Sequence, residues 1–135
     1  MSFFEWQEEY SVKVKIFDDQ HKELFGLIDK LQNAIVAGKG NNIINSVFTE
    51  LFDYCISHFK LEEQHMKDYV YPDFESHRTH HNKFLVKIMK FKKESEDGKP
   101  ILALAVLKFL KSWWVSHILK RDKEYSEFFN AKGLF

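Results

Sequence analysis

The stretch from Ser112 to Asp122, SWWVSHILKRD, decides the fold, because an apolar helical stripe runs through it into a histidine. The stripe begins at Val106 and Leu110, passes through the two tryptophans and continues to His117. Asp122 follows His117 by five residues, which is about 500° of helical rotation and leaves the two side chains roughly 140° apart. If both groups serve one site, the helix cannot be straight, and we predict a widened, π-like turn between them.

Three clusters of turn residues divide the chain: GKGNN at 38–42, YPD at 71–73 and DGKP at 97–100. The segments between them are roughly 20 residues long and carry apolar residues at helical spacing. We therefore predict helices over about 19–37, 42–69, 73–95 and 101–121. In chain order, the residues expected at their N-termini are Asp18 or Asp19, Asn41 or Asn42, Asp73, and Pro100.

Four amphipathic helices joined by short turns predict an all-α, antiparallel up-down-up-down four-helix bundle, formed as a single domain over 1–135. Residues 1–17 differ, because Val12, Val14 and Ile16 alternate with polar residues in the pattern of an extended chain. We expect an extended N-terminal arm that packs along the bundle, anchored by Trp6 and Tyr10. Residues 122–135 are expected to form a short C-terminal helix or tail.

Composition narrows the class of protein. The 135 residues are 44% apolar and include 14 Phe, which is enough to fill one core. The 20 basic and 20 acidic residues cancel, so neither a nucleic-acid face nor a polybasic membrane anchor is indicated. No apolar run can span a bilayer, and the single Cys55 excludes an internal disulfide. We expect a cytoplasmic monomer that binds no nucleic acid and does not insert into a membrane.

In every predicted helix the apolar stripe runs into residues that can bind a metal. They are His21 in the first helix, His58 and Glu62 in the second, His77 with His80 or His81 in the third, and His117 in the fourth. A single histidine on such a stripe is usually a hydrogen-bonded core residue. Here all four helices bury such a group, and each buried group costs roughly 2–7 kcal/mol if it has no partner. Four hydrogen-bonded core histidines are a less plausible explanation than one. All these positions fall at the same end of an up-down bundle, which favours a metal centre in the core.

The number of candidate ligands exceeds what one ion needs. Imidazole suits zinc, copper, iron and nickel, and the lone cysteine argues against a structural zinc site. Five histidines are joined by two carboxylates, Glu62 and Asp122. If both carboxylates and one further oxygen bridge two ions, the ligands fill one six-coordinate and one five-coordinate site. One coordination position is then left open.

These motifs resemble the hemerythrin family, in particular the single-domain bacteriohemerythrins. DDQHKELF at 18–25 is similar to the family's first-helix motif, and Trp6 also matches. HFKLEEQHM at 58–66 contains its H-x-x-x-E, HRTHH at 77–81 its H-x-x-x-H and HILKRD at 117–122 its H-x-x-x-x-D. The resemblance covers nearly the whole chain and implies two non-haem irons joined by an oxo or hydroxo bridge. The ligands it implies are His77, His81 and His117 for one iron, His21 and His58 for the iron with the open position, and Glu62 and Asp122 for both.

The resemblance also implies a dry pocket for dioxygen, lined by Leu24, Phe59, Trp113, Trp114 and Ile118. The same residues would serve equally as core packing. Trp114 departs from the family, which usually has leucine at this position, and an indole there would narrow the pocket. His65 and His80 fall outside the motifs and are expected on the solvated surface or in supporting roles, and Glu63 is expected on a solvated face. Tyr125 is expected near the metal centre, and Cys55 in the core.

The activity implied by the resemblance is reversible dioxygen binding, for carriage, storage or delivery to an oxygen-consuming enzyme. A mostly imidazole ligand set donates less charge to iron than the carboxylate-rich sites of di-iron oxidases, which favours release of oxygen over its cleavage. We therefore expect a binding protein and not an enzyme. The alternatives are a sensing module for oxygen or nitric oxide, a di-iron oxidase or peroxidase suggested by the single Glu62-x-x-His65 motif, and a metal-free structural bundle.

Overall fold

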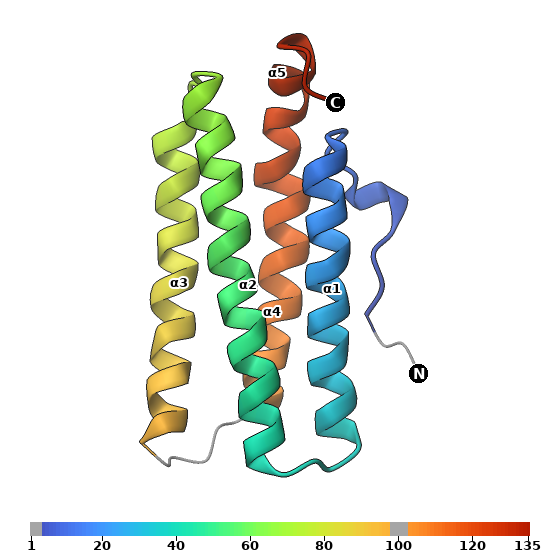
Figure 1. The fold of residues 1–135 in the computed structure, drawn as a ribbon, viewed down its shortest axis with the longest axis vertical. Coiled ribbons are helices and arrows are strands. Elements are labelled where there is room, and N and C mark those ends of the chain that lie inside the picture. The colour runs from blue at the N-terminus through green and yellow to red at the C-terminus, as the bar shows by residue number, and fades with distance from the viewer. Residues whose placement is uncertain (1–3, 98–102) are drawn as a thin grey trace.

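The computed structural model describes residues 4–97 and 103–135 and confirms the four-helix bundle. The long helices are α1 (Lys15–Val36), α2 (Asn41–Asp68), α3 (Phe74–Glu96) and α4 (Ala103–His117). They run up and down in turn, with α1 against α2 and α4, and α2 against α3 (Figure 1). A π-helical turn, Ile118–Asp122, extends α4 and leads through a 3-10 turn, Lys123–Tyr125, to the short α5 (Ser126–Ala131).

The N-terminal arm runs beside α1, with a 3-10 turn at Glu8–Tyr10 (Figure 1). The expected start of the first helix was wrong, because α1 begins at Lys15 and not near residue 19. The Asp18 side chain explains the earlier start. Its carboxylate accepts hydrogen bonds from the Val12 N–H at 2.8 Å and the Ser11 hydroxyl at 2.6 Å. It thus fixes the chain just before the helix from a position inside the first turn, while Asp19 also lies within α1.

The other helix starts differ less from expectation. Gly40 and not an asparagine precedes α2, and no side chain caps that helix. Asp73 stands directly before α3, as predicted. The capping role expected of Pro100, and most of the turn at 97–100, fall outside the described residues.

Three helices end in the same hydrogen-bonded turn, which requires a residue in the left-handed conformation after the last helical turn. At the end of α1 this residue is Gly38, with φ of 67°, and at the end of α5 it is Gly133, with φ of 88°. At the end of α2 it is Val70, with φ of 58°, and the Tyr71 N–H closes the turn on the Met66 carbonyl at 2.8 Å. A β-branched residue is strained in this conformation, so the α2–α3 turn holds backbone strain.

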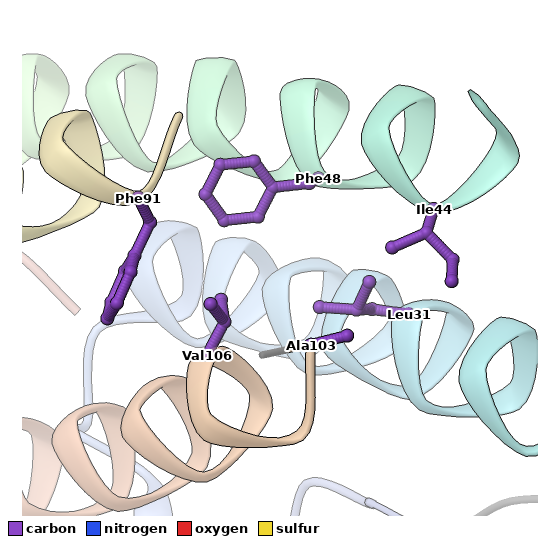
Figure 2. Close-up of a pocket in the computed structure, with 6 residues that line it drawn as sticks. All are labelled: Leu31, Ile44, Phe48, Phe91, Ala103 and Val106. Carbon is purple, nitrogen blue, oxygen red and sulfur yellow. The ribbon is translucent and has the colours of Figure 1, made fainter. Parts of the chain in front are cut away.

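The core runs the length of the bundle, and an apolar pocket lies at the end where α1 meets α2. Its cavity volume is about 10 Å³ and its lining is wholly apolar; Figure 2 shows the residues that line it. Its walls come from all four long helices: Leu31, Ile44, Phe48, Phe91, Ala103 and Val106. The polar core residues lie at the opposite end. Within the described part of the chain, no helix has the length and apolar character needed to cross a bilayer.

Candidate metal centre

Seven buried polar side chains meet at the end of the bundle where α2 passes into α3. We call them the histidine–carboxylate cluster: His21 from α1, His58 and Glu62 from α2, His77 and His81 from α3, His117 at the end of α4, and Asp122 from the π-helical turn. None is more than 3% exposed. The structure therefore brings together the seven residues that the family resemblance implies as ligands.

The π-helical turn from Ile118 to Asp122 confirms the predicted distortion. In a π-helix the backbone bond spans five residues, so residues five apart lie nearly one above the other. His117 Nε2 and Asp122 Oδ1 consequently approach to 2.9 Å. In a regular α-helix the Asp122 side chain would point away from the core. In this structure it points into the core and is fully buried.

The cluster divides into two sides that share both carboxylates. On the three-histidine side, Glu62 Oε1 lies 2.9 Å from His77 Nε2 and 3.2 Å from His81 Nε2. Asp122 Oδ1 lies 3.1 Å from His77 Nε2. On the two-histidine side, Glu62 Oε2 lies 3.3 Å from His58 Nε2, and Asp122 Oδ2 lies 3.2 Å from His21 Nε2. Each carboxylate thus turns one oxygen to each side, as a group that bridges two ions must.

The spacing of these atoms fits metal coordination. Two ligand atoms at about 2.1 Å from one ion and at right angles to each other are about 3.0 Å apart. His21 Nε2 and His58 Nε2 are 3.1 Å apart, and so are His81 Nε2 and His117 Nε2. Both buried oxygens of Asp122 lie close to imidazole nitrogens, but among the described residues none of these contacts has hydrogen-bond geometry. An ionised carboxylate in that position is costly unless a cation compensates it.

The electrostatics of the cluster also favour a cation. Burial alone would raise the pKa of Glu62 and Asp122, but the surrounding histidines outweigh it and hold both pKa values well below the usual range. Burial lowers the pKa of His58, and lowers that of His117 to about 4. Burial acts in the same direction on His77, but its close contacts with the Asp122 and Glu62 carboxylates prevail and raise its pKa to about 10. Contacts with Glu62 and Glu63 likewise outweigh burial and raise the pKa of His81. Both carboxylates are therefore ionised and available to a cation, which would displace the protons that His77 and His81 hold in the metal-free protein.

Several groups around the cluster orient its members. The Gln20 side-chain oxygen lies 2.6 Å from His58 Nδ1, and the Glu63 carboxylate lies 2.8 Å from His81 Nδ1. The Tyr125 hydroxyl donates to Glu62 Oε2 at 2.8 Å. Partners of this kind fix the ring orientation of metal-binding histidines. The sequence reasoning missed Gln20 and placed Glu63 in solvent, although each directly adjoins a candidate ligand in the sequence.

The residues expected to line a dioxygen pocket lie around the cluster. Leu24, Phe59, Trp114 and Ile118 are buried, and Trp113 is partly buried. The Phe59 ring stacks on His81, with 3.8 Å between centroids, and on Trp114 at 5.4 Å. The Trp114 ring centroid lies 5.8 Å from that of His58 and 6.2 Å from that of His21. Its ring is also 5.9 Å from that of His117, so Trp114 adjoins both histidines of the two-histidine side and one histidine of the other side.

The two remaining histidines lie outside the cluster. His65 turns back to its own helix, with Nδ1 2.9 Å from the Leu61 carbonyl oxygen, and its ring meets the edge of Phe17. His80 is half-buried and stacks on His117. His65 thus takes no part in a Glu-x-x-His metal motif, whereas His80 touches a member of the cluster.

Comparison with known proteins gives consistent results. The family model for the hemerythrin HHE cation binding domain matches residues 12–129. The chain is 31% identical to the bacteriohemerythrin of Methylococcus capsulatus over 132 residues, covering 97% of this chain and 100% of the relative. It is 28% identical to that of Clostridium acetobutylicum, covering 90% and 98%.

Solved structures show the same similarity. The chain superimposes on a crystal structure of wild-type hemerythrin with a TM-score of 0.87 and 31% identity, covering 93% of this chain and 97% of that one. It superimposes on a hemerythrin mutant in which tyrosine replaces a leucine with a TM-score of 0.89 and 31% identity, covering 94% and 97%.

Proposed function

The chain belongs to the hemerythrin family, and from that premise we propose that it binds dioxygen reversibly at a di-iron centre held by the histidine–carboxylate cluster. The observation that carries the proposal is the orientation of Glu62 and Asp122. Each turns one oxygen toward His77, His81 and His117 and the other toward His21 and His58. The three-histidine side then offers five ligand atoms and the two-histidine side four, so the open position falls beside His21 and His58.

Iron would supply the reversible electron transfer to dioxygen, which amino-acid side chains cannot perform. The chain's own residues hold the ions and exclude water. Leu24, Phe59 and Trp114 are at most 2% exposed, and the Trp114 ring lies next to those of His21 and His58. Buried apolar surroundings of this kind suit a neutral diatomic ligand and hinder the entry of water and the loss of charged oxygen species.

Reversible binding is better supported than oxidase or peroxidase chemistry. Di-iron carboxylate proteins of the ferritin-like type use paired Glu-x-x-His motifs. Here His65, which would complete such a motif with Glu62, points back to the Leu61 carbonyl. Five imidazoles and two carboxylates leave the ions less electron-rich than a carboxylate-dominated site would. The cluster therefore favours release of the bound molecule.

The test combines iron analysis with visible spectroscopy under controlled oxygen. We expect two irons per chain, a nearly colourless anaerobically reduced protein, and a visible band that appears in air and disappears on degassing. Asp122→Asn should lose iron, because it removes the charge from a fully buried bridging oxygen. The matched control Asp53→Asn changes an exposed carboxylate on α2 and should keep both irons. Absence of iron from the unsubstituted protein, or a permanent loss of the visible band in air, would contradict the proposal.

A further inference from the structure

His80 forms part of a stack of three rings that begins at the protein surface. Its imidazole lies over that of His117, with 5.0 Å between centroids and 12° between planes. Trp113 also stacks on His117, at 4.3 Å and 14°, and on His80, at 5.2 Å and 18°. His117 is 1% exposed, whereas His80 and Trp113 are partly exposed. One layer of aromatic rings thus separates solvent from a member of the cluster.

The outer face of His80 borders a surface hollow of about 280 Å³ between α3 and the π-helical turn. Its other walls are Glu75, Ser76, Thr79, Lys83 and Arg121. Arg121 is held toward the hollow by a 3.3 Å hydrogen bond from its guanidinium to the Ser76 hydroxyl. Glu75 pairs with Arg78 at 3.0 Å, so its charge is balanced on the rim. The hollow therefore carries a net positive charge.

We propose that this hollow is where an anionic one-electron donor docks, and that electrons pass through His80 and His117 to the di-iron centre. The inference rests on the proposed function, because it requires iron in the cluster. Each transfer oxidises the donor by one electron and reduces one ferric ion to ferrous, so two transfers restore the form that binds dioxygen. No bond is made or broken in the protein.

The burial of the cluster makes such a route necessary. All seven members are at most 3% exposed, so a soluble donor cannot touch any of them. On the two-histidine side, His21 and His58 lie behind Trp114, which is fully buried. On the three-histidine side, the path through His80 to His117 is one stacked contact long, and His117 Nε2 is directed into the cluster beside Asp122. Lys83 and Arg121 would attract an anion to its outer end.

The first test replaces the stacked ring by His80→Leu in the iron-loaded protein. Stopped-flow absorption measures reduction of the ferric protein by ferrous EDTA, an anionic complex, and reoxidation of the ferrous protein by ferricyanide. We expect both rates to fall, with an unchanged midpoint potential and visible spectrum, because a lost route slows both directions alike. A change in potential or spectrum would show that His80 only shapes the centre. Equal rates in both proteins would overturn the proposal.

The second test reverses charge without touching the stack. Lys83→Glu should slow reduction by ferrous EDTA about fivefold at ~10 mM ionic strength, where surface charges are weakly screened. Reduction by hexaammineruthenium(II), a cation, should not slow. The matched control Lys90→Glu makes the same change on an exposed lysine of α3 outside the hollow and should leave both rates as they were. Equal effects of Lys83→Glu and Lys90→Glu would overturn the docking site.

These outcomes separate the two proposals. A protein that takes up iron and binds dioxygen, yet transfers electrons equally well in all variants, refutes the electron route alone. A protein that takes up no iron refutes both.

Discussion

Replacing Trp114 by leucine should open the two-histidine side and change how the centre handles dioxygen. The indole is fully buried and stacks on Phe59, and its ring centroid lies 6.2 Å from that of His21 and 5.8 Å from that of His58. Exchanging indole for a leucine side chain frees about 60 Å³, which at ~24 cal/mol per Å³ of cavity costs roughly 1.5 kcal/mol of stability. Since a water molecule in the liquid occupies about 30 Å³, the freed space can admit a diatomic ligand or water.

We therefore expect Trp114→Leu to accelerate dioxygen binding and to speed autoxidation, because water then reaches the centre. Stopped-flow absorption measures oxygen association and dissociation, and the slow decay of the visible band in air measures autoxidation. The control Phe48→Leu removes a buried ring beside the apolar pocket of Figure 2, at the other end of the bundle. It should lower stability without altering either rate. Identical oxygen kinetics and autoxidation in Trp114→Leu and the natural protein would refute the reasoning.

Three further predictions follow from the same region. Tyr125→Phe removes the hydrogen bond to Glu62 and should cost about 2 kcal/mol of unfolding free energy in denaturant titrations, because the acceptor is a charged carboxylate. Val70→Gly should stabilise the folded protein by roughly 1 kcal/mol and raise the Tm by about 4 °C, because Val70 is strained at φ of 58° and its side chain is 79% exposed. The control Val36→Gly, in the last turn of α1, should destabilise the protein, because glycine is a poor helix former. The metal-free protein should be most stable near pH 6.5. As pH falls below that value toward about 4, His58 and His117 become protonated in the unfolded chain but stay neutral in the folded protein, so stability drops. As pH rises toward about 10, the stability contributed by protonated His77 is lost. Bound iron should abolish only the loss of stability at alkaline pH, because a metal-bound His77 carries no proton. Thermal unfolding measured against pH, with and without iron, tests this. A loss of stability at alkaline pH that persists with iron would contradict it.

The four-helix bundle could be predicted from the sequence because short stretches of sequence determine where its helices begin, end and pack. Turn residues separated the helices, and the apolar stripes indicated which faces pack. The start of α1 was missed because Val12, Val14 and Ile16 alternate like a strand, while the contact that ends the extended segment comes from Asp18, inside the helix. Tertiary contacts of this kind are not visible in periodicity.

The cluster could be predicted for a different reason. Histidines on all four apolar stripes indicated a buried site, and the family resemblance selected His81 over His80. A spacing of five between His117 and Asp122 fits a core only if the helix widens, as it does. Which carboxylate oxygen faces which side depends on the rotation of each helix relative to its neighbours. The same holds for the stacking of His80 on His117 and for the contact of Glu63 with His81. A single sequence does not determine those rotations.

The departures from regular backbone geometry have a common location. The π-helical turn before Asp122 and the strained Val70 both lie at the cluster end of the bundle, where α2 turns into α3 and α4 reaches its C-terminus. At the other end, the turn after α1 uses Gly38, which adopts the left-handed conformation without strain. Irregular geometry persists where surrounding contacts over-determine it, and such places are characteristically functional sites. At the π-helical turn the contacts are those of the cluster, because Asp122 needs the distortion to face the histidines. If bound metal supplies the compensating interaction, removing it should loosen the π-helical turn and the α2–α3 turn before the rest of the bundle.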